Sequence, residues 1–133
     1  MDKAFIFLDS HRDLAFATVE NGLPKLRVFR IMRMEGRKLW FATSPRKEVY
    51  RQLQVNPHVE LLAMDGDRSV RASGKAVFDV RDDIAREIYA SNSVLPRLYA
   101  DWRDLAYFSV TVETADYYDL TPDPPVLEHC RWD

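Results

Sequence analysis

The sequence predicts a mainly β fold, a six-stranded antiparallel barrel with two to three short helices. Short segments that alternate apolar and polar residues recur along the chain, which is typical of half-buried strands. Turn signals separate several of them, such as Asn21-Gly22, Glu35-Gly36 and Asp65-Gly66. Helical patterns occur only in the longer stretches between these strand segments. With 133 residues and 47% hydrophobic content, the chain can bury one core, so we expect a single domain over 1–133.

The first third of the chain reads as a short helix followed by three strands. Phe5 and Leu8 would share one side of the helix. The strand patterns are β-branched and aromatic, and the turn signals named above separate them. The predicted helix covers residues 3–10, and the predicted strands cover 14–20, 26–34 and 38–43.

The stretch TSPRKEVYRQLQVNP, residues 43–57, reads as one helix with its start and stop. Ser44 is a good N-cap and Pro45 suits the first helical position. Arg46 and Lys47 then fall in the first turn, where the helix dipole disfavours cations. We interpret this conflict as a site for an anion such as a phosphate, to which Thr43 and Ser44 add hydroxyl donors. The alternative is a solvated basic turn.

The remainder alternates strands with two further helical patterns. The segment over 69–80 alternates most cleanly, and Gly74 in its middle predicts a bend or a close backbone approach. The tail from Thr121 is rich in proline and is expected to be irregular. Tyrosines near the last strand are expected to pack rather than react. The predicted strands cover 59–64, 69–80 and 107–113 with a continuation through 116–120, and the predicted helices cover 81–92 and part of 96–105.

The charge and cysteine content exclude several classes of protein. A formal net charge of −2, from 19 basic and 21 acidic residues, argues against nucleic-acid binding. No apolar run approaches the ~20 residues that span a bilayer, so no membrane partner is expected. Cys130 is the only cysteine, which excludes an intrachain disulfide and favours a reducing compartment. The first residues lack a signal-peptide pattern, so a cytoplasmic location is expected. The histidines lack metal-ligand spacing, and no metal site is predicted.

Arginines interrupt the apolar strand predicted over 26–34. Arg30 shares one face with Val28, whereas Arg27 and Arg33 flank Phe29 on the other. Arginine in an apolar strand indicates a buried partner, a subunit interface or a bound anion, although a barrel rim also tolerates it. Together with the basic helix start and the neighbouring strand that ends at Ala42-Thr43, this pattern describes a ligand with a flat body and a phosphate tail.

These residues resemble the FMN-binding split β-barrel family, the pyridoxamine 5′-phosphate oxidase-like proteins. The matching runs are ATVENGLPKLRVFRI, KLWFATSPRKEVYRQLQVNPHVELL and VRASGKAVF, which lie within 14–80. The most specific elements are Phe41, Thr43 and Lys47, then Asn56-Pro57-His58-Val59, then Ser73-Gly74-Lys75-Ala76. Their order and spacing make a chance match improbable.

The resemblance implies a split-barrel homodimer with FMN in two clefts at the subunit interface. By position, the flavin and ribityl chain would lie along Arg27, Val28 and Phe29, with Ala42 and Thr43 beside them, and Arg46 and Lys47 would hold the phosphate. Ser69 falls near a flavin-contacting position of the family. Arg131-Trp132 is similar to tail residues that some members present across the dimer.

The resemblance therefore implies an FMN-binding, flavin-dependent oxidoreductase that acts on a small molecule of unknown identity. The loop between Thr43 and Lys47 is shorter than in pyridoxamine phosphate oxidases, and their C-terminal substrate segment has no clear counterpart. Vitamin B6 phosphate oxidation is therefore not expected, and the chain is more similar to the small stand-alone members. The alternatives are a non-catalytic carrier of flavin, haem or F420, and an empty interaction module. Arg30 and Arg33 would suit F420, and haem would need an axial ligand in the cleft.

Overall fold

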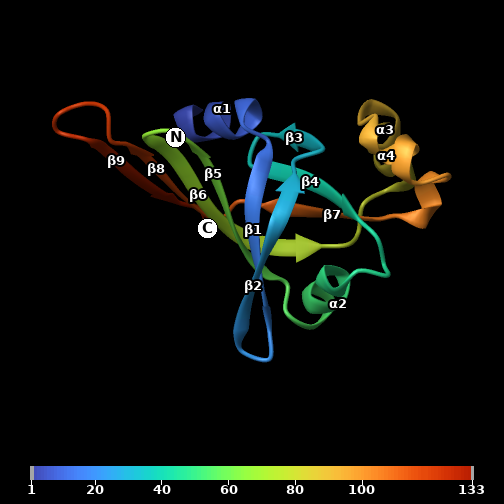
Figure 1. The fold of residues 1–133 in the computed structure, drawn as a ribbon. Coiled ribbons are helices and arrows are strands. Elements are labelled where there is room, and N and C mark those ends of the chain that lie inside the picture. Colours follow the sequence, from blue (N-terminus) through green and yellow to red (C-terminus); the bar gives the residue numbers. More distant parts are fainter. Residues whose placement is uncertain (1, 133) are drawn as a thin grey trace.

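The computed structural model describes residues 2–132, which form a strongly curled, antiparallel half-barrel sheet with helices at its ends and rim (Figure 1). Nine strands and four α-helices lie in this part of the chain, so the prediction of six strands and two to three helices undercounts both. The elements are α1 Asp2–Ser10, β1 Asp13–Glu20, β2 Leu23–Arg30, β3 Arg33–Glu35, β4 Lys38–Thr43, α2 Glu48–Val55, β5 His58–Asp65, β6 Arg68–Val77, α3 Asp82–Ser91, α4 Val94–Leu98, the 3-10 helix η1 Trp102–Asp104, β7 Ala106–Thr111, β8 Thr114–Asp119 and β9 Val126–Arg131.

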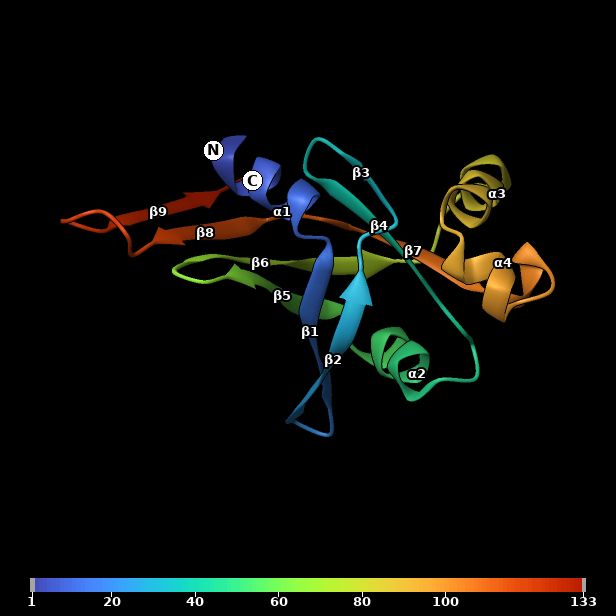
Figure 2. The ribbon, with the colours of Figure 1, turned by 45° about the horizontal axis from the view of Figure 1, so that its top comes forward.

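The sheet divides along β6. The main path runs β2-β1-β5-β6-β7-β4-β3, while β8 pairs with β6 and then with β9. One edge of β6 pairs with β8 up to Ser73 and with β7 at Ala76 and Val77, so β7 and β8 extend in opposite directions along it (Figure 2). Gly74 lies at the division, where a Cβ would be 2.6 Å from the carbonyl oxygen of Thr111. The predicted close backbone approach at Gly74 is confirmed, and the residue is glycine because no side chain fits there.

Two long predicted strands are interrupted. The strand expected over 26–34 is β2 and β3, because the backbone N–H groups of Ile31 and Met32 leave the ladder and donate to the carbonyls of Arg12 and Trp40. The strand expected from 107 onward is β7 and β8, between which Val112 is fully buried. Both breaks are long-range hydrogen-bonding and packing effects that the local alternation does not reveal.

The prediction of an irregular tail from Thr121 is wrong. Val126–Arg131 forms β9, which pairs antiparallel with β8 over its whole length. The prolines that suggested disorder lie before the strand, in the loop that joins β8 to β9. Proline excludes a ladder hydrogen bond only at its own position, so the following residues remain available for pairing.

The main core lies inside the curl of the sheet. Phe16, Phe41 and Phe108 are fully buried, and their rings contact one another at centroid distances of 5.3 to 6.1 Å. Val70 and Ala72 on β6 face this core, as the alternation predicts. A second, smaller cluster lies where α3 and α4 pack near β4 and β7. None of the helices in residues 2–132 has the length and apolar character needed to span a membrane.

Candidate functional site

The segment expected to open the helix after β4 forms a turn instead. The Lys47 backbone N–H donates to the Ser44 carbonyl at 3.0 Å, and the Arg46 N–H donates to the Ser44 hydroxyl at 3.2 Å. Pro45 occupies the second position of this turn, which suits proline as well as a first helical position does. Helix α2 begins at Glu48 after an extended Lys47. The prediction that both cations lie in the first helical turn is therefore wrong: Glu48 is the acidic residue of that turn, and Lys47 is the N-cap that precedes it.

A cleft of about 530 Å³ opens beside this turn. Four of the predicted site residues line it: Val28 and Phe29 from β2, Ala42 from the end of β4, and Lys47. These residues come from three segments, and side chains of helix α4 line the cleft as well. The cleft volume falls within the range of small-molecule sites, roughly 300–1,000 Å³. The fold therefore brings half of the predicted set to one cavity.

Arg46 and Ser44 line an adjoining cavity of about 410 Å³. Leu98 and Tyr99, at the end of α4, line both cavities and separate them. The two cations that we expected at one phosphate thus line two adjoining cavities.

Arg27 lines neither cavity, and its half-buried side chain is held by hydrogen bonds. Its guanidinium donates to the Thr18 hydroxyl and to the side-chain oxygen of Gln52, both at 2.7 Å, and to the carbonyls of Phe16 and Lys25 at 3.2 Å. Burial lowers the pKa of Arg27 from its ordinary value. These contacts join β1, β2 and α2, so Arg27 holds these three elements together behind the cleft.

Thr43 ends β4 with its side chain almost completely buried, at 2% exposure. Its hydroxyl is one of two buried side-chain polar atoms in residues 2–132 that have no hydrogen-bond partner, the other being Nη1 of Arg33. A buried hydroxyl without a partner costs on the order of 1–3 kcal/mol. Thr43 is not among the residues that line the cleft or the adjoining cavity, so its hydroxyl faces the interior rather than the predicted site.

The rim of the cleft carries two arginines of different character. Arg30 makes a bidentate ion pair with Asp13 at 2.9 and 3.1 Å, and this hydrogen bonding holds the pKa of Asp13 below its usual value. Arg97, from α4, also lines the cleft. Arg33 lies elsewhere, with its guanidinium 4.7 Å from the Trp40 ring. Sequence reasoning missed Arg97 because it reaches the cleft only through the packing of α4 beside β2 and β4, which no local pattern shows.

The side chains that line the cleft include few candidates for a reactive group. No histidine in the described chain lines it, whereas Met32 and Tyr99 do. Tyr107, a candidate reactive group, is buried, and burial raises its pKa to about 12. Its hydroxyl donates to the Trp102 carbonyl at 2.9 Å. Tyr107 therefore keeps its proton and has a structural role, as predicted.

Comparisons with known proteins agree with this architecture. The family model of pyridoxamine 5′-phosphate oxidase matches residues 2–119. A NimC/NimA family protein from Clostridium acetobutylicum superposes with a TM-score of 0.80 at 21% identity, covering 98% of this chain and 92% of that one. No curated protein gives a significant match.

Two further solved structures share the fold and carry ligand names. A haem-binding protein from Mycobacterium smegmatis has a TM-score of 0.78 at 16% identity, covering 97% of this chain and 56% of that chain. An FAD-binding protein from Mesorhizobium loti has a TM-score of 0.72 at 15% identity, covering 85% and 89%. At these identities the structures establish the fold alone.

Proposed function

Because the chain belongs to the pyridoxamine 5′-phosphate oxidase family, we propose that it binds FMN non-covalently and acts as a flavin-dependent oxidoreductase on a small molecule. The observation that carries this proposal is the convergence of Val28, Phe29, Ala42 and Lys47 on one cleft. Their segments, β2, the end of β4 and the start of α2, are separated in the sequence. Vitamin B6 phosphate oxidation is not proposed, because its C-terminal substrate segment has no clear counterpart here.

The cleft residues fit the chemical parts of FMN. Phe29, Val28 and Ala42 provide apolar contacts for a flat ring system, and the Lys47 ammonium supplies a positive charge for a phosphate. Bound flavin supplies hydride or electron transfer. The protein holds and orients it, and α4 shields the cleft from water.

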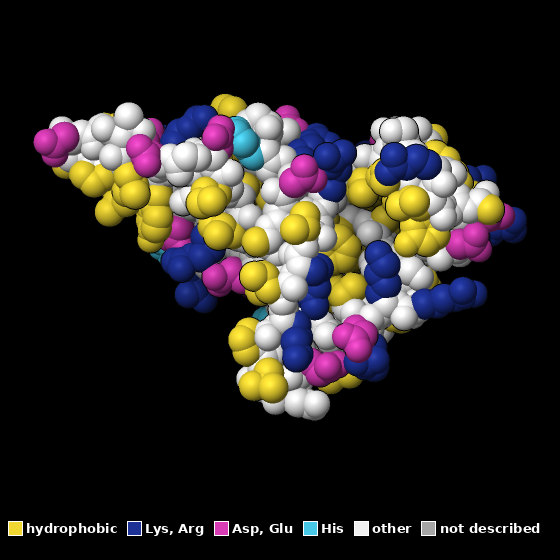
Figure 3. All heavy atoms as spheres, viewed as in Figure 1, with side chains coloured by type: hydrophobic (Ala, Val, Ile, Leu, Met, Phe, Trp, Pro, Cys, Tyr) yellow, Lys and Arg dark blue, Asp and Glu magenta, His cyan; other side chains and the backbone are white. Residues whose placement is uncertain are grey.

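A homodimer with the cleft at its interface is part of this proposal. The outer face of the sheet exposes large apolar side chains around a charged cluster of Glu60, Arg71 and Asp116. Figure 3 shows hydrophobic side chains gathered beneath the arm that β5, β6, β8 and β9 form. Val28 belongs to this face and also lines the cleft, so a second copy seated here would help to close the cleft. The outer-face residues are Leu26, Val28, Leu62, Met64, Tyr118 and Leu127.

A haem carrier is the second candidate function. Met32 and Tyr99 line the cleft, and both side-chain types serve as axial haem ligands in proteins. One relative of the same fold is a haem-binding protein. F420 has less support, because Arg30 is paired with Asp13 and Arg33 is packed against Trp40, which leaves Arg97 as the additional cation.

The test is an absorbance spectrum after incubation with one equivalent of FMN and dialysis. The wild-type protein should retain flavin bands near ~450 nm, and an Arg46→Ala/Lys47→Ala variant should lose them. Lys75→Ala, a change of an exposed lysine on β6, is the matched control and should retain FMN. A wild-type protein that retains no FMN but gains a haem absorption band with hemin supports the carrier. Reduction of bound flavin by NAD(P)H separates an enzyme from a flavin carrier.

A further inference from the structure

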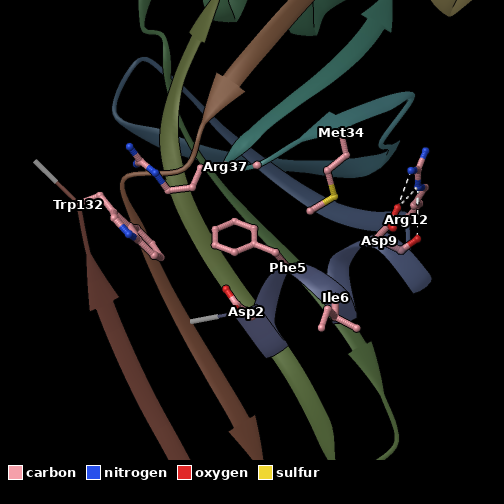
Figure 4. Close-up of a pocket in the computed structure, with 9 residues that line it drawn as sticks. Asp2, Phe5, Ile6, Asp9, Arg12, Met34, Arg37 and Trp132 are labelled. Carbon is pink, nitrogen blue, oxygen red and sulfur yellow. Dashed lines mark hydrogen bonds and ion pairs between the residues drawn. The ribbon is translucent and has the colours of Figure 1, made fainter.

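A second cavity, of about 520 Å³, lies between helix α1, the turn that joins β3 to β4, and the end of β9 (Figure 4). It shares no lining residue with either cavity of the candidate site. Its walls come from segments that are far apart in the sequence. The volume is again that of a small-molecule site.

Apolar and charged side chains line this cavity in equal number, and the apolar ones lie together. Phe5 and Trp132 meet with their ring centroids 5.6 Å apart, and Met34 lies on the opposite side of Phe5 (Figure 4). Ile6 also lines the cavity and is 68% exposed. An exposed aliphatic side chain beside two aromatic rings and a thioether forms a contiguous apolar surface, which flat apolar molecules prefer.

The charged side chains of the cavity differ in whether they already form an ion pair. Arg12 is bound to Asp9 at 2.5 Å, so this pair neutralises itself. Arg37 is oriented by a 2.6 Å hydrogen bond to the Val112 carbonyl and lies 5.2 Å from the Trp132 ring. No carboxylate in residues 2–132 forms an ion pair with Arg37. The Val112 contact leaves other N–H groups of this guanidinium that form no hydrogen bond within residues 2–132, and these can donate to an anionic group.

Asp2 limits how much negative charge the cavity accepts. Its side chain lies on the opposite side of Phe5 from Arg37 (Figure 4). A ligand with one anionic group can place it at Arg37 and leave its apolar body near Asp2. A second anionic group would approach the Asp2 carboxylate and be repelled.

We propose that this cavity binds a planar aromatic monoanion, such as an aromatic carboxylate. The aromatic body contacts Phe5, Ile6 and Met34, and the carboxylate accepts hydrogen bonds from Arg37. The site is independent of flavin binding and stands whether or not the protein is a flavoprotein.

The test is a titration with 2-naphthoate followed by the NMR signals of the tryptophan indole N–H groups, with the Trp132 signal assigned from a Trp132→Phe variant. The Trp132 signal should shift most. 2-Naphthalenemethanol, which is neutral, and 2,6-naphthalenedicarboxylate, a dianion, should each bind at least fivefold more weakly. The same titration in the presence of saturating FMN should give an unchanged dissociation constant.

Two variants test the walls of the cavity. Ile6→Glu places a carboxylate at an exposed position of the cavity and should weaken 2-naphthoate binding at least tenfold. Val55→Glu, the same kind of change at an exposed position of α2, is the matched control and should bind like the wild type. Arg37→Met should abolish the preference for the carboxylate over the neutral alcohol. Unaltered binding by Ile6→Glu, displacement by FMN, or the absence of a Trp132 shift would each overturn the proposal.

Discussion

The guanidinium of Arg27 donates a 2.7 Å hydrogen bond to the side-chain oxygen of Gln52, and this contact joins β2 to helix α2. The same Gln52 oxygen accepts a 2.6 Å hydrogen bond from the Thr18 hydroxyl on β1. Thr18 and Gln52 are buried, so the contact between them is shielded from water, whereas the Arg27 contact is partly buried. Because α2 begins directly after Lys47, this network also sets the position of Lys47 relative to β2.

Replacement of Gln52 by alanine should destabilise the protein. The change leaves the Arg27 guanidinium and the Thr18 hydroxyl without their common acceptor, at a cost of about 2–3 kcal/mol of unfolding free energy. Urea denaturation measures this difference. Gln54→Ala, on the exposed side of the same helix, is the control and should change the unfolding free energy by less than about 0.5 kcal/mol. Equal effects of the two changes would contradict the conclusion that Arg27 and Gln52 hold α2 against β1 and β2.

Single substitutions should separate the roles of the two neighbouring cations. Lys47→Ala should weaken FMN binding by about 10- to 100-fold, since a hydrogen bond to a charged group is typically worth ~1.5–3 kcal/mol. Arg46→Ala should cost less, because Arg46 lines the adjoining cavity. Fluorescence titration with FMN at constant salt gives both dissociation constants. A larger loss for Arg46→Ala would place the phosphate in the adjoining cavity.

Charge on the outer face of the sheet should prevent dimer formation. Met64 and Leu127 are 71% and 60% exposed, and Ser69 and Tyr118 connect them across the strands. A Met64→Glu/Leu127→Glu variant would have to bury two carboxylates per subunit in an apolar interface. Light scattering after gel filtration should report a wild-type dimer and a monomeric variant. Val55→Glu, away from the sheet, should leave the mass unchanged; a monomeric wild type at micromolar concentration would refute the proposed dimer.

The stability contribution of Asp116 should disappear in acid. Burial acts to raise the pKa of Asp116, but hydrogen bonds from His129 and Arg71 outweigh it, so the pKa lies below the ordinary value of 3.8. A depressed carboxyl pKa stabilises the folded state above the unfolded pKa, and the contribution falls as the pH drops through the folded pKa. Asp116→Asn should therefore cost about 1–2 kcal/mol at pH 7 and progressively less below about pH 4.

Urea denaturation of both proteins at pH 7, 5, 4 and 3 measures this dependence. Asp67→Asn, in the exposed turn between β5 and β6, provides a carboxylate control whose effect should be small throughout. A difference between wild type and Asp116→Asn that stays constant down to pH 3 would show that the ionised carboxylate of Asp116 does not stabilise the fold.

The parts of the fold that depend on residues adjacent in the sequence could be predicted from the sequence. Alternation over 69–80 identifies the buried face of β6, and Asn21-Gly22 identifies the β1–β2 hairpin, in which both residues adopt positive φ. The family follows from the ordered motifs around Phe41, Lys47 and Gly74. In each case a few consecutive residues determine the backbone geometry, so the information is local.

The arrangement of the site required the tertiary structure. Ser44 and Pro45 are compatible with a helix start and with a turn, and the position of α2 against the β1–β2 hairpin selects the turn. Arg27 finds an acceptor 25 positions away, which no local pattern reveals. The pairing of β9 with β8 likewise depends on the proline-rich loop, which brings β9 back beside β8.

The sequence alone therefore determined the strand pattern, the family resemblance and the residue types of the site. It did not determine that Lys47 and Arg46 line different cavities, that Arg27 is committed to Gln52, or that Arg37 and Trp132 form part of a second cavity. The physical reason is that propensity and periodicity act over a few residues, whereas the direction of a long basic side chain depends on acceptors and rings that folding brings from distant segments.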